Sequence, residues 1–192
     1  WQDATHITFG VVTLGYERRS WKIEGSAFKG REPGEKRFII EEPKLDSFSG
    51  RLSWNPGPNW ALQASHAFLK SPEELHAGGN AHRTTASAVY NRPLAPKRNL
   101  QTTLVWGRNR LDHQAYDSYL AETALKVSDG WTPFARYEWV RKSAEELVLD
   151  GAFDENSAFN LQQITLGVTK DLPVPGSFSW AISSAGYPTS RR

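Results

Sequence analysis

About ten short segments in which apolar and polar residues alternate account for nearly half of this chain of 192 residues. In the segment Ser20–Phe28, for example, Trp21 and Ile23 share one side of an extended chain, and Lys22 and Glu24 share the other. Such a period of two predicts a β-strand with one apolar face and one polar face. The expected strands are Thr5–Tyr16, Ser20–Phe28, Asp46–Trp54, Trp60–Phe68, Thr84–Tyr90, Leu100–Trp106, Tyr119–Val127, Phe134–Val140, Leu161–Thr169 and Ser177–Tyr187.

The connections between these segments alternate in length. The short ones are Glu17–Ser20, Asn55–Asn59, Arg92–Asn99, Ser128–Trp131 and Pro173–Gly176, and the long polar ones are Lys29–Lys44, Lys70–Ala81, Arg108–Ala115 and Arg141–Ala158. Short turns at one end of the strands and long loops at the other are typical of a β-barrel of the outer-membrane type. We therefore expect an all-β, antiparallel up-and-down transmembrane β-barrel domain over residues 1–192, with about ten strands that form an incomplete barrel.

The composition is compatible with strands that cross a membrane and excludes helices that do so. The chain has 39% hydrophobic residues and a mean hydropathy of −0.56, and it contains no run of ~18 uncharged apolar residues, as a transmembrane helix requires. A barrel strand needs apolar side chains on one face only, so a polar average does not argue against it. The net charge of +2 includes no basic run, which argues against a nucleic-acid partner.

No pattern in the chain predicts a catalytic, metal or cofactor site. There is no cysteine, and the five histidines match no metal-binding spacing, including His76 and His82 in one long segment. Ser65 and His66 are adjacent, so on a strand they point to opposite faces and cannot form a nucleophile–base pair. We therefore expect that the protein is not an enzyme and that it uses no metal and no cofactor.

Tryptophan residues gather near both ends of the expected strands. Trp21, Trp54 and Trp60 lie beside short turns, and Trp106 and Trp139 lie toward the long segments. Two aromatic belts are typical of membrane interfaces, because the rings sit well at the level of the lipid headgroups. We predict that these five side chains are interfacial, although aromatic residues also favour strands in general.

The polar faces of the strands carry charges of both signs. In a soluble sandwich these side chains would face water and need no function, whereas in a barrel they would line the lumen and set what passes. The residues predicted to line the lumen are Glu24, Arg51, Glu122, Arg136 and Glu138. Ion pairs such as Arg51 with Glu24, or Arg136 with Glu122, would brace or plug the interior. The sequence leaves an open and a plugged lumen as alternatives.

Several stretches of the chain resemble a family of uncharacterised outer-membrane proteins of Gram-negative bacteria. They are Asp3–Thr13, Trp21–Pro33, Pro43–Gln63, Arg83–Leu94, Thr103–Asn109 and Ile164–Pro173. The resemblance implies a β-barrel with no established activity. Some members are encoded among copper and other heavy-metal resistance determinants, which implies a role in metal tolerance. Members also look longer at the amino end, so the resemblance implies that this chain is the C-terminal part of a longer protein.

The leading hypothesis is a porin-like channel or transport component for small solutes in the bacterial outer membrane, with the lipid bilayer as its partner. The alternative is a soluble β-sandwich or lipocalin-like protein that binds a ligand or a sugar, in which the tryptophans would line a pocket. A structural barrel with a plugged lumen differs from the first hypothesis only in its conductance. Fractionation of the protein with membranes distinguishes the first two.

Overall fold

The structure is a computed structural model that describes residues 10–31, 44–72, 79–111, 114–128, 130–144, 146–147, 149, 153, 157–172 and 180–186. The described residues form ten β-strands: β1 (Val11–Arg18), β2 (Trp21–Phe28), β3 (Ser47–Gly57), β4 (Trp60–Lys70), β5 (Asn80–Ala95), β6 (Arg98–Leu111), β7 (Gln114–Lys126), β8 (Trp131–Ser143), β9 (Ala158–Leu172) and β10 (Trp180–Gly186). Within these ranges there is no helix that is long and apolar enough to cross a membrane.

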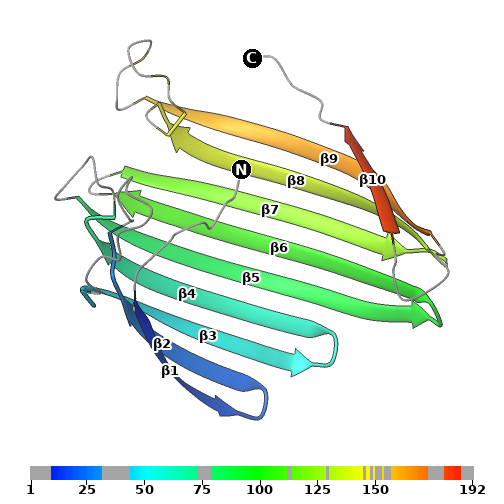
Figure 1. The fold of residues 1–192 in the computed structure, drawn as a ribbon, viewed down its shortest axis with the longest axis horizontal. Coiled ribbons are helices and arrows are strands. Elements are labelled where there is room, and N and C mark those ends of the chain that lie inside the picture. Colours follow the sequence, from blue (N-terminus) through cyan, green and yellow to red (C-terminus); the bar gives the residue numbers. More distant parts are fainter. Residues whose placement is uncertain are drawn as a thin grey trace. The chain divides into compact units, whose positions relative to one another are not determined.

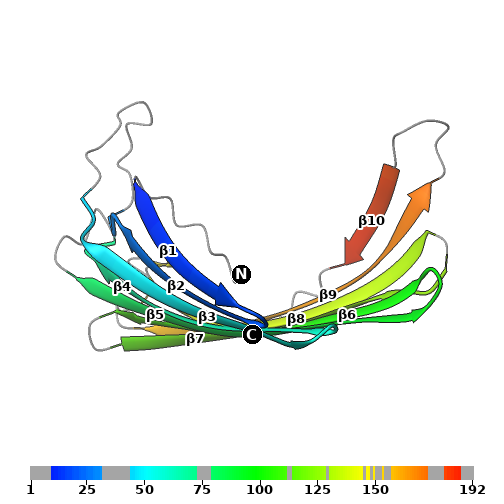
Figure 2. The same cartoon turned by 90° about the horizontal axis from the view of Figure 1, so that it is seen from below.

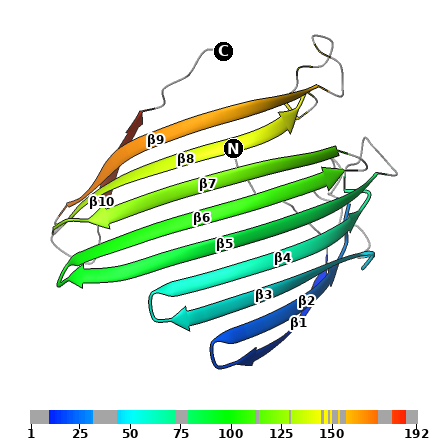
Figure 3. The same ribbon diagram turned by 180° about the vertical axis from the view of Figure 1, so that it is seen from behind.

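The strands belong to one sheet in which their order follows the sequence from β1 to β10 (Figures 1 and 3). The strand pairs whose register is known, among them β1 with β2 and β8 with β9, are antiparallel. Strands β1 and β10 stand at the two ends of the order, so the described part of the sheet is not closed. The prediction of an all-β, antiparallel, up-and-down chain with ten strands is confirmed, whereas its assignment to an incomplete transmembrane barrel stays a prediction.

The chain divides into two compact units. The N-unit comprises β1 to β4, the part of β5 up to Ser87, and residues 106–117 at the adjoining ends of β6 and β7. The C-unit comprises the second half of β5, the first part of β6 up to Val105, β7 from Ser118, and β8 to β10.

In the N-unit, β1 to β4 form consecutive antiparallel pairs, and Figure 2 shows them side by side. A two-residue turn joins β1 to β2, and Arg19 in that turn has a φ of 55°, the left-handed conformation that tight hairpin turns require. The β3–β4 hairpin closes with Gly57 opposite Trp60 and has an irregularity between Trp54 and Gly57. The short turns predicted at these two positions are confirmed.

In the C-unit, β8 and β9 pair continuously from Trp131 opposite Lys170 to Ser143 opposite Ala158. Just before β8, Gly130 has a φ of 82°, and its carbonyl oxygen accepts a hydrogen bond from the backbone N–H of Asp171 at 2.7 Å. A glycine suits this position because residues with a Cβ rarely adopt a positive φ.

The short turn predicted at Arg92–Asn99 is present but shorter than expected, whereas the long loop predicted at Arg108–Ala115 is wrong. The expected turn Arg92–Asn99 is strand except at Pro96 and Lys97, and the expected long loop Arg108–Ala115 is strand except at residues 112–113, which lie outside the described residues. Both stretches are polar, and a polar stretch between apolar segments predicts a loop. A strand end that extends past an apolar band has no need of apolar side chains, so its period of two is lost while its backbone pairing continues. Most of Lys29–Lys44, parts of Lys70–Ala81 and Arg141–Ala158, the turn Pro173–Gly176 and the start of the strand Thr5–Tyr16 lie outside the described residues.

A small apolar cluster lies in the N-unit where β2, β4 and β5 approach the longer connections. Phe28, Leu69 and Ala81 are buried there, and Ala67 and Leu111 pack against them. Phe28, Ala67 and Leu69 lie on the face that also carries the polar strand residues. The buried apolar core of this unit is therefore confined to one end of an otherwise polar face.

The side chain of Ser47 ties three strands together beside this cluster. Ser47 is fully buried, and its Oγ accepts a hydrogen bond from the backbone N–H of Lys70 at 2.9 Å and donates one to Asp46 Oδ1 at 3.2 Å. The backbone N–H of Gly30 also donates to Asp46 Oδ1 at 3.0 Å. These bonds satisfy buried polar groups where β2, β3 and β4 end.

Candidate functional site

Large apolar side chains of the N-unit are exposed on one face of its sheet. Leu14 in β1 is 79% exposed, and Ile23 in β2 and Phe48 in β3 are 58% and 56% exposed. These positions align across the sheet, because Leu14 is opposite Gly25 and Ile23 is opposite Leu52. In a water-soluble protein a sheet packs its apolar face against another layer, and a contiguous exposed apolar patch marks a surface that contacts protein or lipid.

The C-unit has the same distribution of exposed and buried side chains. Leu166 and Ile164 in β9 are 61% and 45% exposed, whereas Glu138 in β8 is 4% exposed. Glu138 is opposite Gln163, so both lie on the other face of the sheet from Ile164 and Leu166. Large apolar side chains are exposed on one face and an ionisable one is buried on the other, which is the reverse of the usual distribution in a soluble domain, although Leu120 and Val140 are buried on the face of Glu138.

Three of the predicted polar-face residues form an ion-pair network in the C-unit. Arg136 Nη2 donates to Glu138 Oε1 at 2.8 Å, and Arg136 Nη1 donates to Glu122 Oε2 at 3.4 Å. Glu122 is directly opposite Arg136, and Glu138 lies two residues along β8 on the same face. The network lines a hollow of about 610 Å³. Its two carboxylates and one guanidinium leave a formal charge of −1, and the predicted Arg136–Glu122 pair is confirmed.

The other two predicted residues, Glu24 and Arg51, line a separate hollow of about 450 Å³ on the polar face of the N-unit. They are directly opposed across β2 and β3, but the Glu24 carboxylate lies 2.9 Å from Lys22 Nζ. Within the described part of the chain, Arg51 has no ion pair. The predicted Arg51–Glu24 pair is therefore wrong. Lys22 lies two residues before Glu24 on the same face of β2, and its long side chain reaches the carboxylate instead.

Sequence analysis did not identify Arg83, which lines the same hollow as Arg51. Strand β5 begins at Asn80, four residues before the predicted start at Thr84, so the period of two extends back from Thr85 to Arg83. Thr85 Oγ1 lies 2.7 Å from Ser65 Oγ across β4 and β5, which places this row on the polar face. Extension of the alternation by one step would have found Arg83.

Three of the tryptophans predicted to be interfacial lie near strand ends, whereas Trp106 and Trp139 lie five and four residues before the ends of β6 and β8. Trp21 and Trp54 are opposed in β2 and β3, and their rings stack with centroids 4.8 Å apart and an interplanar angle of 6°. Trp60 is the first residue of β4, directly after the turn. In the C-unit, the ring of Trp139 contacts that of Tyr119 with centroids 5.5 Å apart. Their role at a membrane interface stays a prediction.

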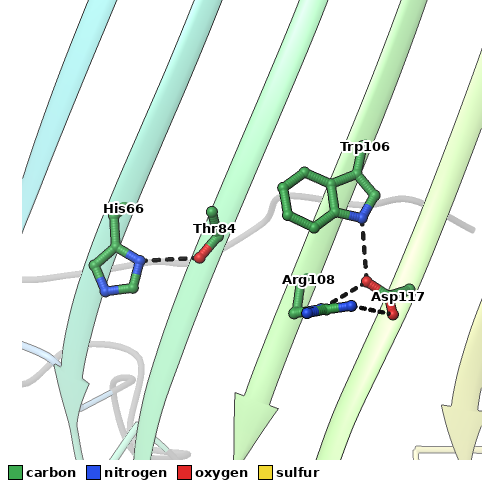
Figure 4. A network of polar contacts seen from close by, with 5 residues as sticks. All are labelled: His66, Thr84, Trp106, Arg108 and Asp117. Carbon is green, nitrogen blue, oxygen red and sulfur yellow. Dashed lines mark hydrogen bonds and ion pairs between the residues drawn. The ribbon is translucent and has the colours of Figure 1, made fainter.

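Trp106, in the N-unit, belongs to a polar network between the ends of β6 and β7 (Figure 4). Its Nε1–H donates to Asp117 Oδ1 at 3.1 Å, and Arg108 donates to both carboxylate oxygens of Asp117 at 2.8 and 2.9 Å. The guanidinium of Arg108 also lies over the Trp106 ring, 5.6 Å from its centroid. An apolar ring with a satisfied N–H beside a charged group suits the boundary between an apolar and an aqueous phase.

His66 and Ser65 have different surroundings, as expected for neighbours on a strand. His66 Nδ1 lies 2.9 Å from Thr84 Oγ1 (Figure 4), and its Nε2 lies 3.4 Å from His82 Nδ1. Ser65 instead lines the hollow on the polar face. Among the described residues, no group of three or more His, Asp or Glu side chains is placed to hold a metal ion. His76 lies outside the described residues.

Comparison with known proteins adds no relative. No protein-family model matches the chain, and neither a curated protein nor a solved structure is found to be similar to it. The resemblance to uncharacterised outer-membrane proteins therefore stays a prediction from the sequence.

Proposed function

We propose that this chain forms part of the wall of an outer-membrane β-barrel, and that its polar face lines a pathway for small solutes. The observation that carries the proposal is the distribution of exposure in both units. Large apolar side chains such as Leu14 and Leu166 are the most exposed, and the charged groups Glu138 and Arg136 face the other way. A barrel wall in a membrane has this distribution, since one face meets lipid and the other meets the lumen.

The strand order and the aromatic side chains support the same proposal. An up-and-down order with short hairpins at Arg18–Trp21 and Gly57–Trp60 is the connectivity of membrane barrels. Stacked Trp21 and Trp54 beside one turn, and Trp106 with its charged neighbours at the far end of β6, are placed where interfacial belts would lie.

The soluble alternative, a β-sandwich or lipocalin-like binding protein, has less support. Such a protein encloses its apolar side chains, either between two sheets or inside the barrel. Here Ile23, Leu52 and Phe48 are exposed together, so a soluble form of the chain would present them to water. A link to metal tolerance rests on the family resemblance alone.

Fractionation of the protein from a Gram-negative host tests the proposal. We expect it to stay with the outer membrane after an alkaline wash, to need detergent for extraction, and to change its gel mobility on boiling, as folded membrane barrels do. Recovery in the soluble fraction without detergent would contradict the proposal and favour the binding protein. Planar-bilayer recording then separates a channel from a plugged barrel, because a folded barrel without conductance above background would retain only the structural role.

A further inference from the structure

The hollow on the polar face of the N-unit has an unusual balance of charge. Two guanidinium groups, those of Arg51 and Arg83, line it, and Glu24 is the one carboxylate among its described lining residues. Glu24 is already neutralised by Lys22, whose Nζ lies 2.9 Å from Glu24 Oε1. The remaining formal charge is therefore +2, from the two arginines.

Neither arginine has an ionic partner within the described ranges of the chain. The Nε atom of Arg83 is buried and donates no hydrogen bond there. A buried donor without an acceptor destabilises the folded state, and a bound acceptor would relieve that cost. The Nε of Arg136 in the C-unit is also without an acceptor, but both terminal nitrogens of that side chain bind carboxylates. Arg83 differs because no carboxylate holds any part of its guanidinium.

Hydroxyl-bearing side chains from successive strands line the same hollow as the two arginines. Thr13 Oγ1 and Ser26 Oγ lie 2.8 Å apart across β1 and β2, and Ser26 is opposite Ser49 in β3. In the next row, Arg51 is opposite Ser65. A hydroxyl rotates to donate or accept, so this lining adapts to a bound anion and adds donors to those of the arginines.

We propose that this hollow binds a small soluble oxyanion, of the phosphate or carboxylate class, through Arg51 and Arg83. The planar guanidinium presents paired N–H donors that match two oxygens of a phosphate or a carboxylate. A cation would be repelled by the +2 charge, and a neutral sugar would leave both charges uncompensated. The site lies on the opposite face from exposed Leu14 and Ile23, so its ligand comes from the solution and not from a lipid headgroup.

Binding of inorganic phosphate to the detergent-folded protein, measured by calorimetry in a buffer free of other oxyanions, tests the site. We expect Arg51→Gln and Arg83→Gln each to raise the Kd by about ten- to a hundredfold, because each removes a charge-assisted hydrogen bond. Arg51→Lys, which keeps the charge but loses the paired donors, should fall between the wild type and Arg51→Gln. Acetate, as a planar probe, separates a preference for carboxylates from one for phosphate.

Arg110→Gln is the matched control, because Arg110 lies in β6 of the same unit and does not line the hollow. It makes the same change of charge and should leave phosphate binding unchanged. Equal weakening by all three Gln variants would overturn the proposal, since binding would then follow only the total charge. No phosphate binding by a protein that keeps its heat-modifiable mobility would overturn it as well.

Binding of an oxyanion to this hollow does not require that the chain inserts into a membrane, whereas a role of the hollow in transport rests on the proposed function. Different results would refute the binding site and the channel. A conducting barrel that does not bind phosphate would refute the site and keep the channel. Phosphate binding that needs Arg51 and Arg83, in a protein that leaves the membrane without detergent, would refute the channel and keep the site.

Discussion

The polar hollows of the two units are built from the same kinds of residue but use them differently. In the C-unit, Arg136 lies between Glu122 and Glu138 and bonds to both. In the N-unit, Lys22 forms an ion pair with Glu24, and Arg51 lines a hollow together with hydroxyl-bearing side chains. The first arrangement crosslinks β7 and β8, whereas the second leaves a positive charge available to a ligand. A charged residue on the polar face therefore either links neighbouring strands or is available to a solute, depending on which nearby side chain pairs with its potential partner.

The apolar faces of the two units, in contrast, are alike, and the largest expected effect tests that likeness. Ile23→Arg in β2 and Leu166→Arg in β9 should each destabilise the folded protein by about 2–4 kcal/mol if they lie near the bilayer midplane, because both side chains would face lipid. Urea titration of the heat-modifiable form in lipid vesicles measures the loss.

Ser49→Arg is the matched control, because Ser49 lies on the polar face of β3 and lines the N-unit hollow. It should be tolerated. If the outward and inward substitutions cost the same, neither face contacts lipid and the barrel assignment fails. If Ile23→Arg lowers the free energy of unfolding and Leu166→Arg does not, the apolar faces of the two units differ as well.

The second prediction concerns the ion pairs that distinguish the hollows. Arg136→Gln should cost about 2 kcal/mol, less than the 3–5 kcal/mol of a fully buried pair, because Arg136 itself is partly exposed while the Glu138 it leaves behind is buried. Arg51→Gln should change stability by less than ~0.5 kcal/mol, since it breaks no ion pair. The same urea titration gives both values, and a larger loss for Arg51→Gln would reverse the comparison.

The third prediction concerns packing at the end of the N-unit hollow. A Cβ added at Gly30 would lie 2.7 and 2.8 Å from the backbone O and N of Lys70 and would also clash with Ser47 Oγ. Gly30→Ala should therefore cost about 1–2 kcal/mol, within the range for overpacking. Gly25→Ala, with nothing within 4 Å of its added Cβ, is the control and should be close to neutral. A neutral Gly30→Ala would show that this end of the strands adjusts easily.

The period of two was enough to predict the strands and their faces, because it depends only on the extended backbone. It placed Arg51 and Glu24 on one face, and the register places them directly opposite each other. It could not predict that Lys22 captures Glu24, since that depends on side-chain length and on competition between two cations for one carboxylate. It also did not predict Arg83, because the first residues of β5 are polar and resemble a loop in the sequence. The bonds of Ser47 with Lys70 and of Asp46 with Gly30 join segments that are 23 and 16 residues apart in the sequence, and no local pattern predicts them.

The smallest expected effect, and the most direct test of the contrast between the units, is on ion selectivity. A lumen charge changes the local concentration of counter-ions, so neutralising it shifts the ratio of anion to cation permeability. Removal of one charge should change this ratio by no more than about fivefold, because a unit charge at ~4 Å in water is worth about 1 kcal/mol. Arg51→Gln should move selectivity toward cations. Arg136→Gln should move it less, since the charge of Arg136 is already offset by two carboxylates. Reversal potentials in a salt gradient across a planar bilayer measure both, and equal shifts would mean that the ion pairs of the C-unit do not mask Arg136.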